Sequence, residues 1–235
     1  MPRAVLVSGA GGALGAALVA HFAQTDAVVV AVGRSVVQAE LDAKFGAGRT
    51  LAASLELASP AAWRELVERL ARAELAVDGA VLAAGGWRGG APLSETADDV
   101  WSSMIALNLE TARVSLQALL PDMLGARRGS IVLVASLAAA RPWESAGAAA
   151  YAASKAAALA LVQATAAEVL ASGVRVNAIL PSTIDTPANR SAMPKADFAR
   201  WVAPESLAEV AGFLLSDAAR DISGAALPVY GRVGV

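Results

Sequence analysis

The sequence of 235 residues predicts an α/β fold, a doubly wound parallel sheet in a single domain. Short runs of Val, Leu, Ile and Ala alternate with longer helical patterns along the whole chain. The runs are almost entirely apolar, which is typical of parallel strands that helices cover on both faces, whereas half-exposed antiparallel strands would alternate polar and apolar residues. No linker-like stretch divides the chain, and its length suits one hydrophobic core.

The first elements form a βαβ unit. Residues 4–8 are a short apolar strand, a glycine-rich turn follows, an alanine-rich helix reaches about residue 24, and residues 27–32 form the second strand. The remaining strands are expected at residues 79–84, 130–135, 175–180 and 226–230. The remaining helices are expected at residues 60–74, 96–124, 149–171 and 205–215.

The segment 181–204 differs from the rest because it carries four prolines and little periodicity. A connection of this length is uncommon in compact domains and is often a binding lid. We expect it to cover a small-molecule substrate.

Composition excludes several classes of function. No apolar run approaches the roughly 18 to 20 residues of a membrane span, and 19 Lys+Arg against 21 Asp+Glu leave no basic stripe for nucleic acid. Zero cysteines and a single histidine argue against a disulfide framework and against a metal site. His21 is expected to pack on its helix. Without a secretory signal at the start, the expected compartment is the cytoplasm.

The glycine-rich turn after the first strand predicts a phosphate-binding site. Small residues at this position let backbone N–H groups and the N-terminus of the following helix approach a pyrophosphate. The candidate residues are Gly9, Gly11, Gly12, Ala13, Leu14 and Gly15.

The end of the second strand predicts the choice of cofactor. A dinucleotide site usually has a carboxylate about 20 positions further on, which accepts a hydrogen bond from the ribose 2′-hydroxyl. Here the sequence reads Gly33-Arg34-Ser35, so no carboxylate is present to repel a 2′-phosphate. The guanidinium of Arg34 could instead bind that phosphate. The sequence therefore favours NADP(H), with NAD(H) as the alternative cofactor and a solvated loop arginine as the alternative for Arg34.

Tyr151 and Lys155 form a candidate proton-transfer pair. They are four residues apart in a helical pattern, so their side chains are neighbours on one helix face. The pKa of a free tyrosine is near 10, and a neighbouring ammonium lowers it by favouring phenolate. The pair can thus donate or accept a proton during catalysis.

Two further polar residues are candidates. Ser136 ends the strand 130–135, at the carboxyl edge where parallel sheets bind ligands. Asn108 lies inside an apolar, alanine-rich helical pattern, where an amide is disfavoured unless it makes a specific bond. Its alternative role is structural, in a kinked helix.

Taken together, these residues resemble the short-chain dehydrogenase/reductase family over essentially the whole chain. The matching pieces occur in the family's order. They are the turn Gly9 to Gly15, Ala83-Ala84-Gly85, Asn108, Ser136, Tyr151-Ala152-Ala153-Ser154-Lys155, and Asn177 to Pro181 followed by Thr186-Pro187.

The resemblance implies a Rossmann fold over residues 1–235 and an NADP(H)-dependent oxidoreductase. Tyr151 would exchange a proton with the substrate oxygen, Lys155 would hold the nicotinamide ribose, Ser136 would orient the substrate, and Asn108 would support a relay water. The other cofactor contacts that the resemblance implies are Ala84, Gly85, Gly86, Pro181, Ile184 and Thr186, in addition to Arg34 and Ser35. The chain departs from the family at Ala13, Ala84, Ser54 and Ser182.

A second, local resemblance is to dihydropteridine reductases. It covers Gly11 to Gly15, Ala84 to Gly90, and Asp185 to Arg190 followed by Met193 to Phe198. That enzyme type typically prefers NADH and often lacks a serine at the position of Ser136. Arg34 and Ser136 are therefore features of this chain that dihydropteridine reductases do not usually share. Trp87 and Trp143 could stack a flat heterocycle or could pack in an interface, and Trp201 would belong to the lid.

The sequence leaves two alternatives to a carbonyl reductase. One is a dihydropteridine reductase using NADH or NADPH. The other is a non-catalytic NADP(H)-sensing protein, because a protein can keep the fold of an enzyme family without its catalytic activity. Retention of both Tyr151 and Lys155 favours an enzyme. The alanine-rich faces of the helices at 96–124 and 149–171, through which family members usually pair, predict a homodimer or homotetramer.

Overall fold

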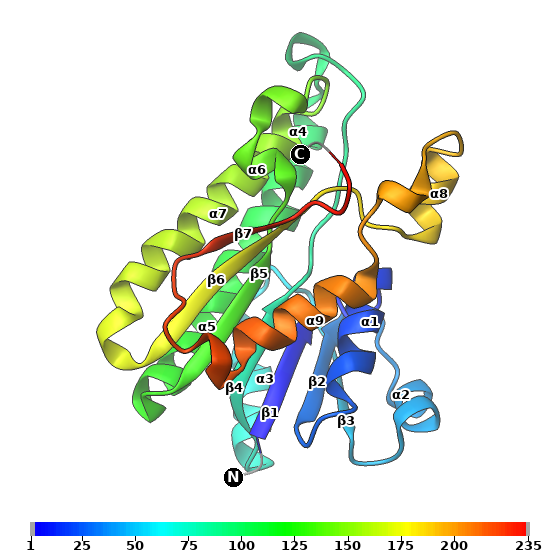
Figure 1. The fold of residues 1–235 in the computed structure, drawn as a ribbon. Helices are drawn as coiled ribbons and strands as arrows, with labels where there is room; N and C mark the ends of the chain where they lie inside the picture. Colours follow the sequence, from blue (N-terminus) through cyan, green and yellow to red (C-terminus); the bar gives the residue numbers. More distant parts are fainter. Residues whose placement is uncertain (1–2, 234–235) are drawn as a thin grey trace.

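Parallel strands form the central sheet of the protein, in the order β3-β2-β1-β4-β5-β6-β7 (Figure 1). The structure is a computed structural model, and it describes residues 3–233. The strand order reverses between β1 and β4, and the crevice beyond the carboxyl ends at such a switch point is where open α/β sheets bind ligands. The strands are β1 (Arg3–Ser8), β2 (Val28–Gly33), β3 (Thr50–Ser54), β4 (Ala76–Leu82), β5 (Gly129–Val134), β6 (Val174–Pro181) and β7 (Ala226–Val229).

Each inner strand is apolar because both of its faces are covered. In β1, Ala4 and Leu6 belong to one core layer and Val5 and Val7 to the other, and all four side chains are buried. Continuous burial of this kind is what the unbroken apolar runs predicted. The parallel doubly wound sheet is confirmed.

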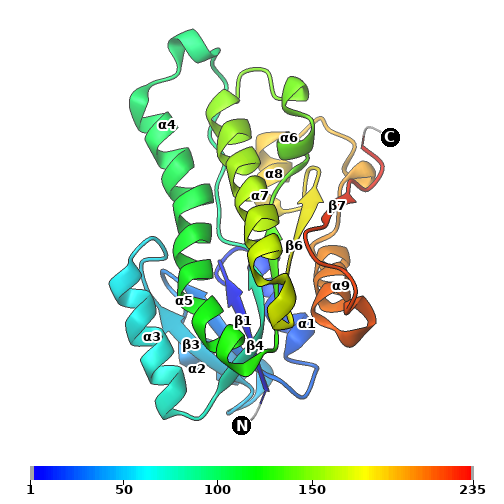
Figure 2. The same ribbon diagram turned by 90° about the vertical axis from the view of Figure 1, so that its left-hand side faces the viewer.

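Helices cover the two faces of the sheet in separate layers. Figure 2 looks onto the layer of α3, α5 and α7, while α1 and α9 lie on the opposite face in Figure 1. The large fully buried Trp63 of α3 anchors the first layer. The longer helices are α1 (Ala13–Phe22), α2 (Gln38–Phe45), α3 (Pro60–Arg72), α5 (Thr111–Ala126), α7 (Ala149–Val169) and α9 (Pro204–Leu215).

The sequence-based assignment missed one helix and one strand. Helix α2 buries none of its residues, and β3 forms an edge of the sheet, paired only with β2. The expected single helix 96–124 is also interrupted: α4 (Asp98–Met104) leads into the π-helical segment η2 (Ile105–Glu110), and α5 follows it. Asn108 lies in η2, so the helix that carries it is irregular at this point. An irregular helix is what the alternative, structural role of Asn108 predicted.

Helix α7 corrects the expectation that no segment of the chain is long and apolar enough to span a membrane. With the 3-10 turn η4 (Leu170–Ser172), it forms a segment from Ala149 to Ser172 that is long and apolar enough to cross a membrane by length and composition alone. Its buried residues Ala158 and Val162 pack into the core layer beside β6. The apolar character of α7 is thus that of a core helix packed on a sheet.

Short helical turns complete the fold, and most lie at the carboxyl edge of the sheet. The expected irregular segment 181–204 contains two of them and is more ordered than its prolines suggested. These elements are η1 (Leu93–Glu95), α6 (Leu137–Ala140), η3 (Pro142–Glu144), α8 (Pro187–Ala192), η5 (Phe198–Arg200) and η6 (Asp217–Ala219).

Candidate active site

The glycine turn lies at the switch point between β1 and β4, and its packing requires residues without a Cβ. Gly9 has a φ of +73°, and a Cβ there would lie 2.8 Å from the backbone nitrogen of Ala84. A Cβ at Gly15 would lie 2.0 Å from the Gly9 carbonyl oxygen. The end of β1, the turn and α1 therefore pack closely against one another. The outer side of the turn, including Gly11, is open.

The N-terminus of α1 is free to meet an anion. Gly12 is the N-cap and supplies no side-chain cap, and Ala13 begins the helix. The first N–H groups of a helix lack intrahelical partners, so this end favours a phosphate group. Ala13 and the preceding glycines are exposed, and the departure from glycine at Ala13 thus creates no clash in the helix.

Arg34 and Ser35 occupy an exposed bend directly after β2. The bend is held in place because the Ser54 hydroxyl accepts a hydrogen bond from Val36 N–H at 3.1 Å and donates one to the Val36 carbonyl at 3.0 Å. Within residues 3–233, no described group pairs with the Arg34 guanidinium. Ser54, which the sequence marked only as a departure from the family, therefore anchors the segment that carries Arg34.

Tyr151 and Ser136 meet at the carboxyl end of β5. The Ser136 hydroxyl lies beside the Tyr151 phenol and lowers the pKa of that phenol, and it accepts a hydrogen bond from the Ala138 N–H at 3.1 Å as the N-cap of α6. Burial raises the pKa of Tyr151 above its ordinary value, and the Ser136 hydroxyl partly offsets the rise. This corrects the expectation that Lys155 lowers the pKa of Tyr151, because burial outweighs the neighbouring groups.

Lys155 lies one helical turn beyond Tyr151 and is buried. Its ammonium donates a hydrogen bond to the Val134 carbonyl oxygen at 3.0 Å, and burial lowers the pKa of Lys155 to about 8. A Cβ placed on Gly85 would lie 3.1 Å from Lys155 Nζ, so the strand end after β4 passes directly over the ammonium.

Asn108 holds this strand end by both of its hydrogen-bonding groups. Its Oδ1 accepts from Gly86 N–H at 2.9 Å, and its Nδ2 donates to the Gly86 carbonyl at 3.1 Å. The π-helical geometry of η2 turns the side chain toward Gly86, and π-bulges are frequent at functional sites.

The residues after β6 form one wall of the site. Pro181 is buried at the end of β6, and Ile184 pairs with Val202 in an isolated parallel bridge. The Thr186 hydroxyl accepts from Asn189 N–H at 3.2 Å and so caps α8, which leaves its own hydrogen free to be donated.

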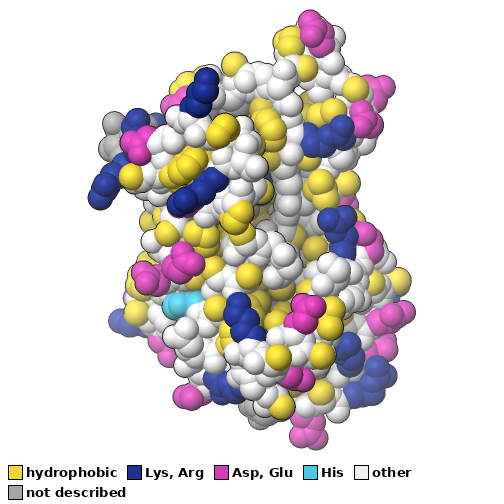
Figure 3. Space-filling view, turned by 90° about the vertical axis from the view of Figure 1, so that its right-hand side faces the viewer, with side chains coloured by type: hydrophobic (Ala, Val, Ile, Leu, Met, Phe, Trp, Pro, Cys, Tyr) yellow, Lys and Arg dark blue, Asp and Glu magenta, His cyan; other side chains and the backbone are white. Residues whose placement is uncertain are grey.

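The segment 181–204 folds as a unit with its own contacts. Arg190 forms a bidentate ion pair with Asp185, at 2.5 and 2.7 Å, and its guanidinium lies 4.8 Å from the centre of the Phe198 ring. Phe198 packs on Trp201 with ring centres 4.8 Å apart, so Trp201 belongs to this segment as expected. Figure 3 shows this face hollowed beside the segment, with basic and acidic side chains interspersed over the surface.

The chain's last described residues lie against the same segment. Arg232 N–H donates to the Arg200 carbonyl at 2.9 Å, and Arg200 Nε donates back to the Arg232 carbonyl at 3.0 Å. The Tyr230 carbonyl accepts from the Ser182 hydroxyl at 2.8 Å. Ser182, where the family has glycine, thereby ties the end of β6 to the tail.

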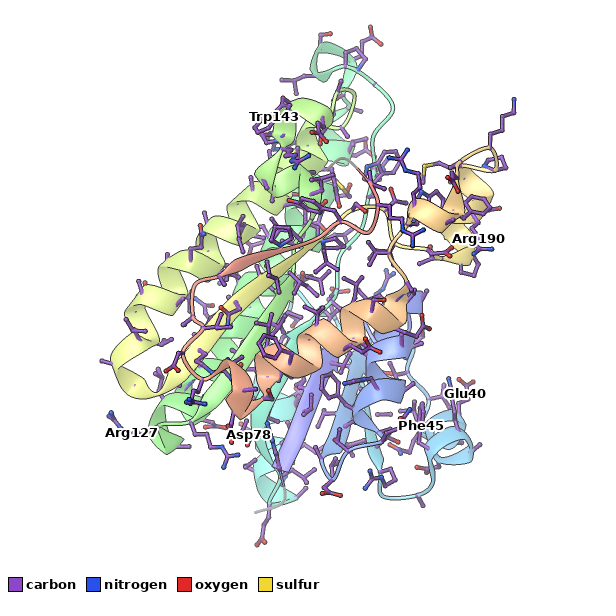
Figure 4. All side chains as sticks on the ribbon, in the orientation of Figure 1. Glu40, Phe45, Asp78, Arg127, Trp143 and Arg190 are labelled. Carbon is purple, nitrogen blue, oxygen red and sulfur yellow. The ribbon has the colours of Figure 1, made fainter. Side chains whose placement is uncertain are left out.

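Trp143 and Trp87, the two tryptophans proposed to stack a heterocycle, are both exposed. Trp143 is 74 % exposed and projects at the top of the molecule in Figure 4. Trp87 is 62 % exposed and contributes to a hollow of about 340 Å³ beside residues 147–150, next to Tyr151. A second hollow of about 460 Å³, which contains Asp78, lies at the opposite edge of the sheet. None of the predicted catalytic or cofactor residues lines either hollow.

The described residues bring no group of three or more His, Asp or Glu side chains together in a metal-like cluster. His21 packs edge-on against Phe22, with ring centres 5.0 Å apart, as expected for a helix residue.

Sequence reasoning overlooked two groups of the site. Ser154, quoted only as part of a motif, is fully buried and lies within hydrogen-bonding distance of Asn108. The Val134 carbonyl, which binds Lys155, is a backbone atom that no residue pattern discloses. A polar residue in the alanine-rich helix α7 was the available signal for Ser154.

Comparison with known proteins agrees with this geometry. The family model for short chain dehydrogenases matches residues 3–197. A 3-oxoacyl-[acyl-carrier-protein] reductase from Pseudomonas aeruginosa is 30% identical over 97% of this chain and 96% of its own. A D-threitol dehydrogenase from Mycolicibacterium smegmatis is 33% identical over 97% of this chain and 92% of its own.

Solved structures show the same architecture. An oxidoreductase of the short chain dehydrogenase/reductase family from Burkholderia thailandensis superposes with a TM-score of 0.86 and 33% identity, covering 98% of this chain and 92% of that one. The family-model match runs from β1 through the helix that carries Tyr151 and Lys155 and ends within the segment 181–204. The chain belongs to the short-chain dehydrogenase/reductase family and is an NAD(P)-dependent oxidoreductase of Rossmann fold.

Proposed function

We propose that the protein reduces a carbonyl or quinonoid C=N bond of a small molecule with NADPH, with Tyr151 as the proton donor. The observation that supports this most directly is the position of the buried Tyr151 phenol beside Ser136 at the carboxyl edge of the sheet, one helical turn from the buried Lys155. A phenol that is buried beside a serine hydroxyl, one helical turn from a lysine, is suited to general acid–base catalysis.

Each protein group has a distinct part in this proposal. Ser136 orients the substrate oxygen against the Tyr151 hydroxyl, which gives its proton to that oxygen. The Lys155 ammonium then stabilises the phenolate left behind. In the oxidative direction the same groups work in reverse. The bound nicotinamide supplies the hydride, and the protein supplies orientation and electrostatics.

The described residues fit a dinucleotide. Glycines at positions 9 and 15 keep the turn close to α1, and the uncapped N-terminus of α1 suits the pyrophosphate. Arg34, exposed and without a described partner, suits the 2′-phosphate of NADP(H). A related structure from Beutenbergia cavernae, 32% identical with a TM-score of 0.87, contains bound NADP. NADP(H) is thus the proposed cofactor, and NAD(H) the alternative.

A dihydropteridine reductase is the alternative enzyme. The sequence stretch Gly86-Trp87-Arg88-Gly89-Gly90 favours it, and exposed Trp87 could stack a flat heterocycle beside the hollow next to Tyr151. A non-catalytic NADP(H) sensor is the alternative of another class. For either enzyme we propose a homodimer or homotetramer in the cytoplasm.

The test measures oxidation of NADPH and NADH by the purified protein with a quinonoid dihydropterin and with a reactive ketone. Tyr151→Phe serves as the matched variant, since it removes the hydroxyl and keeps the ring. Turnover of the ketone that Tyr151→Phe reduces by about 10² to 10⁴ supports the proposal. Tyrosine-dependent turnover of the pterin alone identifies a dihydropteridine reductase, and NADPH binding without any turnover supports the sensor.

A further inference from the structure

Ser154 connects three parts of the active site through one buried hydroxyl. It lies on α7 immediately before Lys155 and has no exposed surface. Its Oγ donates to the Tyr151 carbonyl at 2.8 Å and accepts from Asn108 Nδ2 at 3.0 Å. Through Asn108 the same network reaches Gly86.

The direction of each hydrogen bond is fixed by the groups involved. A serine hydroxyl has one hydrogen, and the Tyr151 carbonyl can only accept, so that hydrogen points to the carbonyl. The Ser154 oxygen must therefore accept from Asn108, and only the NH₂ end of the amide can donate. This leaves Asn108 Oδ1 for Gly86 N–H, so one arrangement satisfies the Ser154 hydroxyl and the Asn108 amide together.

The strand end after β4 packs closely on this network. A Cβ on Gly85 would lie 2.8 Å from Asn108 Oδ1 and 3.1 Å from Lys155 Nζ. The strand end 85–86 is thus packed directly on the amide and on the lysine. A shift of Asn108 would move the strand end that lies over Lys155.

We infer that Ser154 is a positioning residue, whose hydroxyl holds Asn108 and the strand end at Gly85 and Gly86 in a fixed place relative to Tyr151 and Lys155. Its effect on turnover rests on the proposed function. Ser154 contacts no reacting atom in this assignment and acts through Asn108. Loss of its hydroxyl leaves one Asn108 N–H with only the weak acceptor Met104 Sδ at 3.8 Å in a buried site, which favours displacement of the amide.

The variant Ser154→Ala tests this inference, and the chain offers a matched control. Ser115 on α5 is also buried and donates to the carbonyl one turn earlier, Thr111, at 2.6 Å. It differs from Ser154 because it does not accept from the active-site amide. Ser115→Ala therefore removes a comparable buried hydroxyl outside the network.

Ser154→Ala is expected to lower kcat by about tenfold to a hundredfold, the range that a misplacement near the chemistry produces. The substrate KM should change much less than kcat, and the pH at half-maximal kcat should move. Ser115→Ala should leave kcat and its pH profile unchanged. Equal kcat losses in the two variants would assign Ser154 to stability alone and overturn the inference.

A double variant separates positioning from independent effects. If Ser154 acts through Asn108, adding Ser154→Ala to Asn108→Ala should lower kcat no further. Multiplication of the two losses would overturn the inference. If the wild-type protein turns over no substrate, the proposed function fails, and NADPH binding tests Ser154 instead. Ser154→Ala should then weaken NADPH binding several-fold with Ser115→Ala unchanged, and equal affinities would refute the positioning role.

Discussion

The Lys155 ammonium donates its hydrogen bond to the carbonyl oxygen of Val134, the last residue of β5, at 3.0 Å. The bond fixes α7 to the carboxyl end of the sheet, and it places a cation in a buried position where desolvation lowers its pKa to about 8. The site therefore contains a charge that opposes folding at neutral pH.

Lys155→Met should stabilise the protein without ligands while abolishing turnover. The fall in the pKa of Lys155 from 10.5 to about 8 corresponds to about 3 kcal/mol, and the unpaired Val134 carbonyl would cost about 1 kcal/mol of that. We expect a net gain near 2 kcal/mol at pH 7, measured by urea unfolding.

The stability difference between Lys155→Met and the wild-type protein should depend on pH, and the lowered pKa of Lys155 determines the direction. Below pH 8 the lysine is charged in both the folded and unfolded states, so the burial cost is complete. Between pH 8 and 10.5 the folded protein loses its proton first, and the wild-type protein gains stability as pH rises. The advantage of Lys155→Met should shrink between pH 8 and 10, and a constant difference would contradict the buried ammonium.

Ser136→Ala should move the pH profile of the oxidative reaction upward. Burial raises the pKa of Tyr151 and the Ser136 hydroxyl lowers it, so removing the hydroxyl leaves only the rise. The phenolate required as base then forms at higher pH. The basic group in the pH–rate profile is the coupled Tyr151–Lys155 pair. The measured quantity is therefore the shift of the profile along the pH axis between the two proteins. Ser136→Thr, which keeps a hydroxyl, is the control.

Arg34→Asp should reverse the cofactor preference. The carboxylate would repel a 2′-phosphate and accept from a ribose 2′-hydroxyl, whereas the guanidinium now lies unpaired among the described residues. We expect the ratio of kcat/KM for NADPH over NADH to fall by at least about tenfold, as for loss of a charge-assisted hydrogen bond. Arg220→Asp, an exposed arginine at the opposite edge of the sheet, controls for charge; an unchanged ratio would remove Arg34 from the cofactor site.

Gly15→Ala should destabilise the protein where Gly11→Ala does not. The new Cβ at Gly15 would lie 2.0 Å from the Gly9 carbonyl oxygen, whereas a Cβ at Gly11 meets nothing within 4 Å. Forcing α1 away from the turn should cost about 1 to 3 kcal/mol. Thermal unfolding without cofactor measures the difference, and equal midpoints for the two variants would contradict the packing described for the turn.

Sequence reasoning reached the sheet and most of the site because both rest on strong local signals. Apolar strands and the glycine turn are specified by short-range pattern, and Tyr151 and Lys155 by helical spacing. It missed β3, whose Leu-Ala-Ala core lacks the usual strand residues, and α2, which buries nothing. The role of Ser154 and the break at η2 depend on bonds across elements, which no window of sequence contains.

The π-helical segment η2 has a consequence for how this chain can vary. A π-helical turn holds one residue more than an α-helical turn. Deleting a residue between Ile105 and Glu110 would replace this wide turn with an ordinary α-helical turn and move the side chains of η2 by up to about 100° around the helix axis. Asn108 would then face away from Gly86. Substitutions in η2 are therefore compatible with the fold at most positions, whereas insertions and deletions are not, and helix length here is under stronger constraint than helix composition.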